Sequence, residues 1–266
     1  IQNTCHPQTL SVLKTRAKPL GIKIIFNNPN EDTFGCLIQN PDTYGEIADL
    51  DSLIKLNKEK DILSIVAADI MNLVVMKSPR IFGADIVVGT SQRFGVPMGL
   101  GGPHAAFFAT LDEYKRMMPG RLIGVSVDRN NKRSYRMALQ TREQHIRREK
   151  ATSNICTAQA LLAIISASYA IYHGPERLKN IANNIHHHTR YLKKSLEILG
   201  FKIISKNYFD TLLINSSEAK YWVDKSIEHG INFRLVNDKS FTLSLDETTT
   251  LQEIDNLLIF FNEKKY

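Results

Sequence analysis

Short, almost uninterrupted apolar runs alternate with amphipathic segments along the first part of the chain. Residues 62–68 and 85–89 are the clearest runs, and such runs are typical of strands covered on both faces in a parallel sheet. The weaker strand-like segments are 22–26, 34–39 and 105–109, and the helix-like segments are 9–20 and 47–58. This alternation predicts an α/β fold, doubly wound around a mostly parallel sheet.

The pattern changes in the second half of the chain. Two alternating runs, 123–128 and 134–139, predict a hairpin. A long helical stretch follows and is expected to break at Gly174 and resume at Pro175, because proline fits the first turn of a new helix. The last segments predict strands at 211–214, 232–236 and 241–245, and helices at 217–228 and 250–261.

These elements divide the chain of 266 residues into three expected parts. Residues 1–155 belong to a large α/β domain, 156–199 form long connecting helices, and 200–266 form a small α+β domain. Thr250 and Glu253 have the spacing of a capping box at the start of the last helix.

Composition excludes several classes of protein. With 43% hydrophobic and 23% charged residues the chain is globular, neither disordered nor of low complexity. No apolar stretch reaches the roughly 20 residues of a membrane span, so no membrane association is expected. Three widely spaced cysteines argue against a disulfide framework and fit a reducing, cytoplasmic compartment. The chain starts at Ile1 without an initiator Met or a signal-peptide pattern, so we expect it to begin partway through a longer protein.

Positive charge is concentrated between Lys115 and Lys150. That segment holds eleven Lys or Arg and three acidic residues, a net charge of +8, whereas the whole chain carries +7. A solvated face, a nucleic-acid footprint or a dock for an acidic protein all fit such a segment. Tyr135 is its only aromatic residue, so a base-stacking surface is missing and no nucleic-acid partner is expected.

Polar residues follow both clear apolar strands, at the place where open α/β sheets bind ligands. Asp69 follows the first strand and the segment 90–93 follows the second. Asp69 also suits the N-cap of a helix at 70–75. The glycine-rich segment 99–102 comes next; glycines let backbone amides approach a phosphate, and a tight turn explains them equally well.

Three consecutive histidines and a histidine near a glutamate raise the question of a metal site. His186, His187 and His188 point about 100° apart on a helix and cannot chelate one ion together, so a solvated helix face is expected. His145 and Glu149 have helical i, i+4 spacing, for which an ion pair or a cap is expected. We predict no metal.

Several long motifs resemble the P-protein of the glycine cleavage system. The longest is residues 89–109, GTSQRFGVPMGLGGPHAAFFA, and the others are 5–9, 15–18, 116–121, 139–148 and 150–162. Together they cover essentially the whole chain. This family, glycine dehydrogenase (decarboxylating), is a pyridoxal-phosphate (PLP) enzyme of fold type I. The resemblance implies that the large domain is a partial fold type I transferase-like domain, in the cytoplasm or, in a eukaryote, the mitochondrial matrix.

The same family has two homologous halves, fused or separate, and the chain resembles the N-terminal half without its first part. In the C-terminal half a lysine at the position matching Gln92 forms the Schiff base with PLP. A carboxamide is not a nucleophilic amine, so no catalytic residue is expected here. Neither Lys77 nor Lys150 follows the expected strand, and the chain alone is expected to be inactive.

The resemblance also implies roles for the strand-end residues. Asp69 matches the aspartate that pairs with the pyridine nitrogen of PLP. The other candidate cofactor-binding residues are Ser91, Gln92, Gly99, Gly101 and Gly102. By pseudo-symmetry, the glycine loop would reach the PLP phosphate held mainly by the other half.

The implied partners are the C-terminal half or second subunit, glycine as substrate, and the lipoylated H-protein that receives the aminomethyl group after decarboxylation. A different reading remains open, in which the chain is a non-catalytic scaffold whose basic segment docks an acidic partner.

Overall fold

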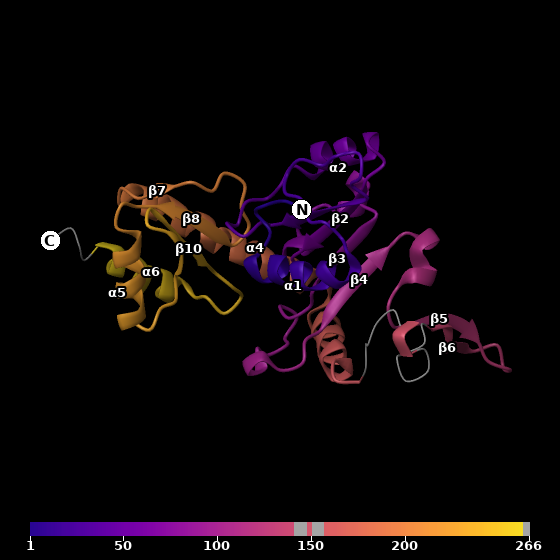
Figure 1. The fold of residues 1–266 in the computed structure, drawn as a ribbon. Coiled ribbons are helices and arrows are strands. Elements are labelled where there is room, and N and C mark those ends of the chain that lie inside the picture. Colours follow the sequence, from indigo (N-terminus) through magenta and orange to yellow (C-terminus); the bar gives the residue numbers. More distant parts are fainter. Residues whose placement is uncertain (141–147, 151–156, 263–266) are drawn as a thin grey trace.

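The structure, a computed structural model, describes residues 1–140, 148–150 and 157–262 (Figure 1). Two sheets lie toward opposite ends of a long helix, and a two-stranded hairpin projects beside the first sheet. Within the described ranges, none of the helices combines the length and the apolar character needed to span a bilayer.

The first sheet has four strands in the order β1-β2-β3-β4. These strands are β1 (Gly35–Asn40), β2 (Leu63–Ala68), β3 (Ile86–Thr90) and β4 (Ala106–Thr110). The first three are parallel and β4 is antiparallel to β3, which confirms the mostly parallel α/β sheet. The predicted strand at 22–26 is wrong. Its Ile25 carbonyl accepts from the amino group of Ile1, and the segment joins no ladder.

Helices α1 (Pro7–Ala17) and α2 (Leu50–Glu59) accompany this sheet. Helix α2 begins three residues later than its apolar pattern suggests, because Asp49 caps it and accepts from the Ser52 amide at 3.2 Å. Ile54 of α2 is fully buried against Val66 of β2, in a core that also contains Ile38 of β1.

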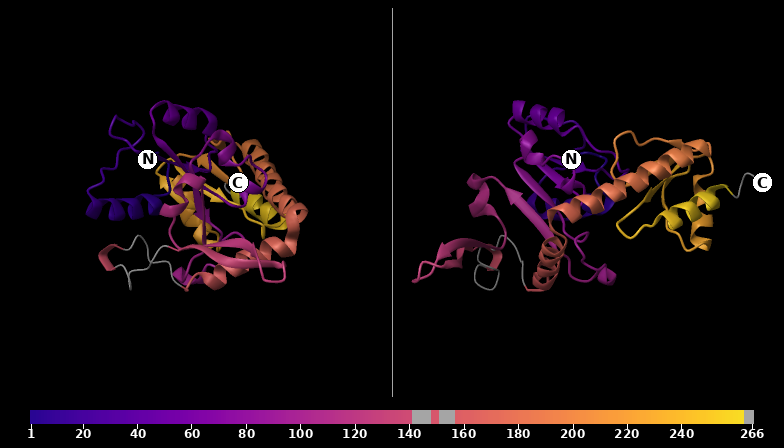
Figure 2. Two further views of the ribbon diagram at one scale, coloured as in Figure 1. Left: turned by 90° about the vertical axis from the view of Figure 1, so that its right-hand side faces the viewer. Right: turned by 180° about the vertical axis from the view of Figure 1, so that it is seen from behind.

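The long helix α4 (Ala160–Ile198) bends at Gly174, whose φ of +64° is not helical, immediately before Pro175 (Figure 2). The expected break is therefore a kink inside one continuous element. The hairpin of β5 (Arg121–Val127) and β6 (Arg133–Gln140) is confirmed.

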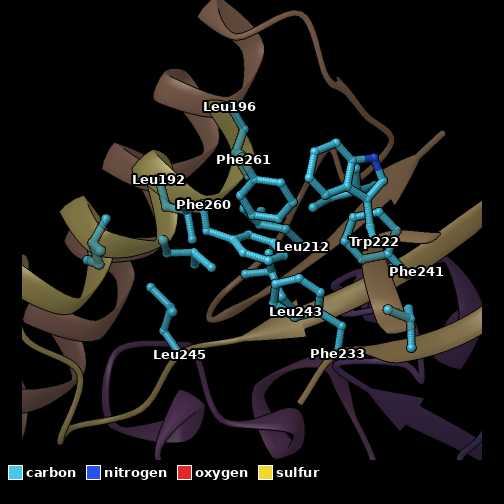
Figure 3. Close-up of a cluster of buried hydrophobic side chains, with 14 of the residues drawn as sticks. Leu192, Leu196, Leu212, Trp222, Phe233, Phe241, Leu243, Leu245, Phe260 and Phe261 are labelled. Atoms are coloured by element: carbon cyan, nitrogen blue, oxygen red, sulfur yellow. The ribbon is translucent and has the colours of Figure 1, made fainter. Parts of the chain in front are cut away.

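The second sheet is antiparallel with the order β7-β8-β10-β9. Its strands are β7 (Lys202–Ile203), β8 (Thr211–Asn215), β9 (Arg234–Asn237) and β10 (Ser240–Ser244). Helices α5 (Ala219–Glu228) and α6 (Leu251–Asn262) pack on it together with the end of α4. Aromatic side chains, among them Trp222, Phe241 and Phe261, fill the core between these layers (Figure 3).

The capping box at α6 is confirmed by reciprocal hydrogen bonds. Glu253 accepts from the Thr250 amide at 2.7 Å, and the Thr250 hydroxyl accepts from the Glu253 amide at 3.2 Å. The division of the chain into domains at residues 155 and 199 stays a prediction.

Candidate functional site

The carboxyl ends of the parallel strands meet at one edge of the first sheet. Asn40 ends β1 opposite Ala68 of β2, and the Asp69 amide donates to the Asn40 carbonyl at 3.3 Å. The segment that follows β3 lies against the same edge, because Arg93 contacts Asp69. The structure therefore brings together the two strand ends that the sequence singled out.

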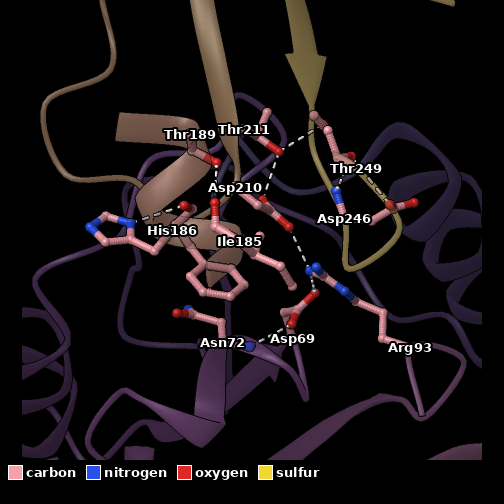
Figure 4. Close-up of polar contacts among 12 residues, drawn as sticks. Asp69, Asn72, Arg93, Ile185, His186, Thr189, Asp210, Thr211, Asp246 and Thr249 are labelled. Atoms are coloured by element: carbon pink, nitrogen blue, oxygen red, sulfur yellow. Dashed lines mark hydrogen bonds and ion pairs between the residues drawn. The ribbon is translucent and has the colours of Figure 1, made fainter. Parts of the chain in front are cut away.

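Asp69 uses both carboxylate oxygens within the chain (Figure 4). Its Oδ1 accepts from the Asn72 amide at 2.8 Å, at the first residue of a short 3₁₀ turn, Asn72–Val74. Its Oδ2 accepts from Nη1 of Arg93 at 2.8 Å. The helix expected at 70–75 is only this short turn, and its N-cap position is Met71, so Asp69 bonds the first amide of the turn without being its N-cap.

Arg93 links the two sheets. The same Nη1 donates to Oδ2 of Asp210 at 2.5 Å, and Asp210 directly precedes β8 of the second sheet. The guanidinium also lies 5.5 Å from the ring centroid of Phe209. The Nη2 atom of Arg93 is buried and has no hydrogen-bond partner among the described residues.

The three charges of this cluster are largely removed from water, with side-chain exposures of 20% for Arg93, 26% for Asp69 and 14% for Asp210. Burial raises the pKa of Asp210, and the nearby Arg93 offsets part of that rise. Burial alone would lower the pKa of Arg93, but Asp69 and Asp210 together raise it above its usual value. Arg93 therefore stays cationic.

Ser91 and Gln92 lie in the turn between β3 and Arg93. The Ser91 hydroxyl is buried and accepts from the Ser166 hydroxyl of α4 at 2.9 Å. The Gln92 amide donates to the Thr90 hydroxyl at 3.1 Å, and the Gln92 carbonyl accepts from the Val96 amide at 3.0 Å. These bonds fix the backbone around Gln92.

The glycine-rich segment forms an exposed 3₁₀ turn, Gly99–Gly101. Gly99 and Gly101 have φ of +59° and +82°, and a Cβ added to either would meet nothing within 4 Å. A Cβ on Gly102 would lie 3.0 Å from the Gly99 carbonyl oxygen. The loop therefore points its glycines into solvent and not onto Asp69 or Arg93.

The remaining candidates separate clearly. His186 is half-buried, and its Nδ1 lies 3.0 Å from the Phe209 carbonyl, so the solvated-face prediction is wrong for this histidine. It is right for the exposed His187, and His188 is half-buried. Lys77 is exposed, whereas His145 and the side chain of Lys150 lie outside the described residues. In the part of the chain that the structure describes, no three metal-ligating side chains cluster.

Sequence reasoning missed Asp210, which completes the charged cluster. Arg93 and Asp210 are 117 residues apart, so no local spacing connects them. The one local signal was the place of Arg93 just after a buried strand, because an arginine needs a counter-charge when it is buried.

Comparisons with known proteins agree with one another. The family model for the glycine cleavage system P-protein matches residues 1–261. The mitochondrial glycine dehydrogenase (decarboxylating) of Pisum sativum is 49% identical over 267 residues, which are 98% of this chain and 25% of that protein. The Pelagibacter ubique glycine dehydrogenase (decarboxylating) is also 49% identical, over 98% of this chain and 28% of its own length. The chain thus spans about a quarter of the length of these relatives.

Solved structures point to the same fold. A glycine decarboxylase (P-protein) of the glycine cleavage system, in inhibitor-bound form, superposes with a TM-score of 0.88 at 29% identity, over 98% of this chain and 64% of that one. A NifS-like protein, 16% identical with a TM-score of 0.67, shares the fold type I architecture.

Proposed function

Because the chain belongs to the glycine cleavage system P-protein family, we propose that it is part of the half of this enzyme that lacks the Schiff-base lysine. In this role it supports PLP-dependent glycine decarboxylation and aminomethyl transfer to the lipoylated H-protein by assembling with a lysine-bearing half or subunit. The observation that carries the proposal is the Asp69–Arg93 ion pair directly beside Gln92.

The strand-end site of this chain does not fit a covalently held PLP. Gln92 offers no amine, and both oxygens of Asp69 already accept hydrogen bonds within the chain. A pyridinium placed on Asp69 would also meet the positive charge of Arg93. The residues that would tune the cofactor in an active half serve here as a structural cluster.

We expect purified chain mixed with PLP and then treated with borohydride to give no adduct at a unique lysine. The reason is that the position after β3 holds Gln92, and exposed lysines such as Lys77 react only weakly and without selectivity. Peptide mass mapping measures the result, with a PLP enzyme that has a Schiff-base lysine as the positive control. A stoichiometric adduct at one lysine would contradict the proposal.

The glycine loop supports a second part of the proposal, a contact with the cofactor phosphate of the lysine-bearing half. Backbone amides of an exposed loop with positive φ can converge on an anion, and Gly99 and Gly101 leave room for a close approach. The cofactor is held mainly by the other half, and this loop completes its phosphate site.

Replacing Gly101 with valine in a two-half enzyme should raise the dissociation constant for PLP about tenfold, equivalent to one lost hydrogen bond to a charged group of about 1.5 kcal/mol. The φ of +82° at Gly101 is strained for a β-branched residue, so the loop would change its backbone. Absorbance titration measures the affinity.

The matched control is Gly230→Val, since Gly230 has a φ of +71°, its added Cβ would likewise meet nothing within 4 Å, and it lies in the turn after α5. An unchanged PLP affinity in the Gly101 variant, with assembly intact, would mean that the loop is only a turn. That outcome would favour the scaffold role instead.

For the H-protein we propose that the exposed cations at the hairpin turn steer its approach. Arg129, Lys132 and Arg133 lie at this turn and are exposed. Clustered exposed cations accelerate association with an acidic protein face, which the lipoyl carrier would present.

A further inference from the structure

Four segments of the chain border a pocket of about 720 Å³. They are the start of α2, the turn that follows Asp69, the second half of α4 and the segment before β8. A volume of this size is in the range of sites for small organic ligands. Neither Gln92 nor the glycine loop lines the pocket, so a ligand there is separate from the cofactor of the proposed function.

Asn72 is a buried polar residue of this pocket. It is only 2% exposed, and its Oδ1 has no hydrogen-bond partner among the described residues. Figure 4 shows its carboxamide on the side where His186 lies and away from Arg93. A buried amide oxygen without a partner is costly, and rotation about the last side-chain bond can present either this oxygen or the amide nitrogen to the pocket. A bound hydroxyl would satisfy the unpaired group.

Other neutral polar side chains line the same pocket. Asn183 and His186 are three residues apart on α4 and therefore share one helix face. The Phe209 carbonyl can only accept, so Nδ1 of His186 donates to it at 3.0 Å, and Nε2 of the neutral ring is then an acceptor. Asn207 lines the pocket from the segment before β8. Amides and imidazoles offer donors and acceptors side by side, as the hydroxyls of a sugar require.

Two cations complete the lining. Arg190 continues the polar face of α4, and Lys206 lies on the segment before β8. Both are exposed, and neither forms an ion pair in the part of the chain that the structure describes. Asp49, an acidic residue of the pocket, already accepts from the amide and the hydroxyl of Ser52. The two cations are therefore available to an anionic ligand.

We propose that this pocket binds a phosphorylated sugar. The phosphate lies between Arg190 and Lys206, because two cations match a phosphate dianion and arginine can donate two parallel hydrogen bonds to it. Sugar hydroxyls bond Asn72 and His186. Met76, on the same turn as Asn72, offers an apolar surface to the carbon atoms of the sugar ring.

Isothermal titration calorimetry of the purified chain with glucose 6-phosphate tests the proposal. Inorganic phosphate and glucose should each bind at least about tenfold more weakly, because each makes only part of the contacts. Arg190→Met removes one cation at an exposed position and should weaken binding of glucose 6-phosphate at least about tenfold. The matched control is Lys194→Met, an exposed lysine one turn further along α4 that does not line the pocket, and it should bind like the wild type.

Asn72→Leu separates ligand binding from folding. Leucine is similar in size and brings no unpaired oxygen, so the free energy of unfolding should stay the same or rise. The affinity for glucose 6-phosphate should nevertheless fall about fivefold, as loss of a neutral hydrogen bond does. Urea unfolding and calorimetry on the same variant measure both quantities, and Arg190→Met decides the matter if Asn72→Leu does not fold.

Three results would overturn the proposal. The first is the absence of binding at millimolar glucose 6-phosphate. The second is equal affinity for inorganic phosphate and glucose 6-phosphate, which would mean that the hydroxyls make no contact. The third is wild-type affinity in both Arg190→Met and Asn72→Leu, which would place the ligand elsewhere on the chain.

Discussion

Replacement of Arg93 by methionine should lower the free energy of unfolding by about 3 kcal/mol or more, the cost of leaving a buried charge without its partner. Asp69 and Asp210 would keep their charges in positions that are only 26% and 14% exposed. Urea unfolding followed by far-ultraviolet circular dichroism measures the change.

Two controls test whether the loss comes from leaving buried charges unpaired and not simply from removing an ion pair. Lys115→Met removes the exposed Lys115–Asp112 pair and should change stability by less than about 1 kcal/mol. Adding Asp210→Asn to Arg93→Met should recover part of the loss, because one of the unpaired charges disappears. An Arg93 variant as stable as wild type would show that the cluster contributes nothing to stability.

The stability lost in Arg93→Met should also depend on pH in a defined direction. Burial raises the pKa of Asp210, and Arg93 partly lowers it again. Without Arg93 the folded variant therefore binds a proton at the Asp210 carboxylate more tightly than the unfolded chain does. Stability from this group therefore increases as pH falls through the folded-state pKa. The deficit of Arg93→Met relative to wild type should shrink between neutral and mildly acidic pH.

Local patterns predicted most elements of the fold. The continuous apolar runs became β2 and β3, the alternating runs became the hairpin, and Thr250 with Glu253 capped α6 as expected. Each of these features depends on residues close in sequence. The failed strand at 22–26 was apolar and β-rich, but a strand also needs a neighbour to pair with, which composition does not supply.

The candidate site was predictable only in part. The edge of the sheet and Gln92 followed from strand order and from the resemblance. The pairing of Arg93 with both Asp69 and Asp210 did not, because it depends on how the second sheet lies against the first. In this pairing Asp69 neutralises Arg93 and also accepts from the Asn72 amide.

The cluster also couples the two sheets mechanically. Arg93 follows β3 of the first sheet and Asp210 precedes β8 of the second, and the Leu245 amide, just after β10, donates to the Asp210 carbonyl at 3.0 Å. A disturbance in the core of the second sheet should therefore reach the strand-end site through β8 and β10.

Replacement of Phe241 by alanine should destabilise the protein by about 4 kcal/mol, within the range for deleting a buried aromatic side chain. Phe241 is fully buried at the centre of the second sheet and stacks on Phe233 at a centroid distance of 5.4 Å. The single tryptophan of the chain, Trp222, lies in the same core, so its fluorescence reports unfolding there.

The control is Leu251→Ala, at the start of α6, where the side chain is 54% exposed and the loss should stay below about 1 kcal/mol. If Arg93 and Asp210 couple the sheets, Trp222 fluorescence and circular dichroism should give coincident transitions in Phe241→Ala, because both sheets unfold together. In Phe241→Ala combined with Arg93→Met, the Trp222 fluorescence transition should come at lower urea than the circular dichroism transition. The reason is that the Arg93–Asp210 ion pair between the two sheets is then absent. Separate transitions in the single variant would mean that the second sheet unfolds independently of the charged cluster.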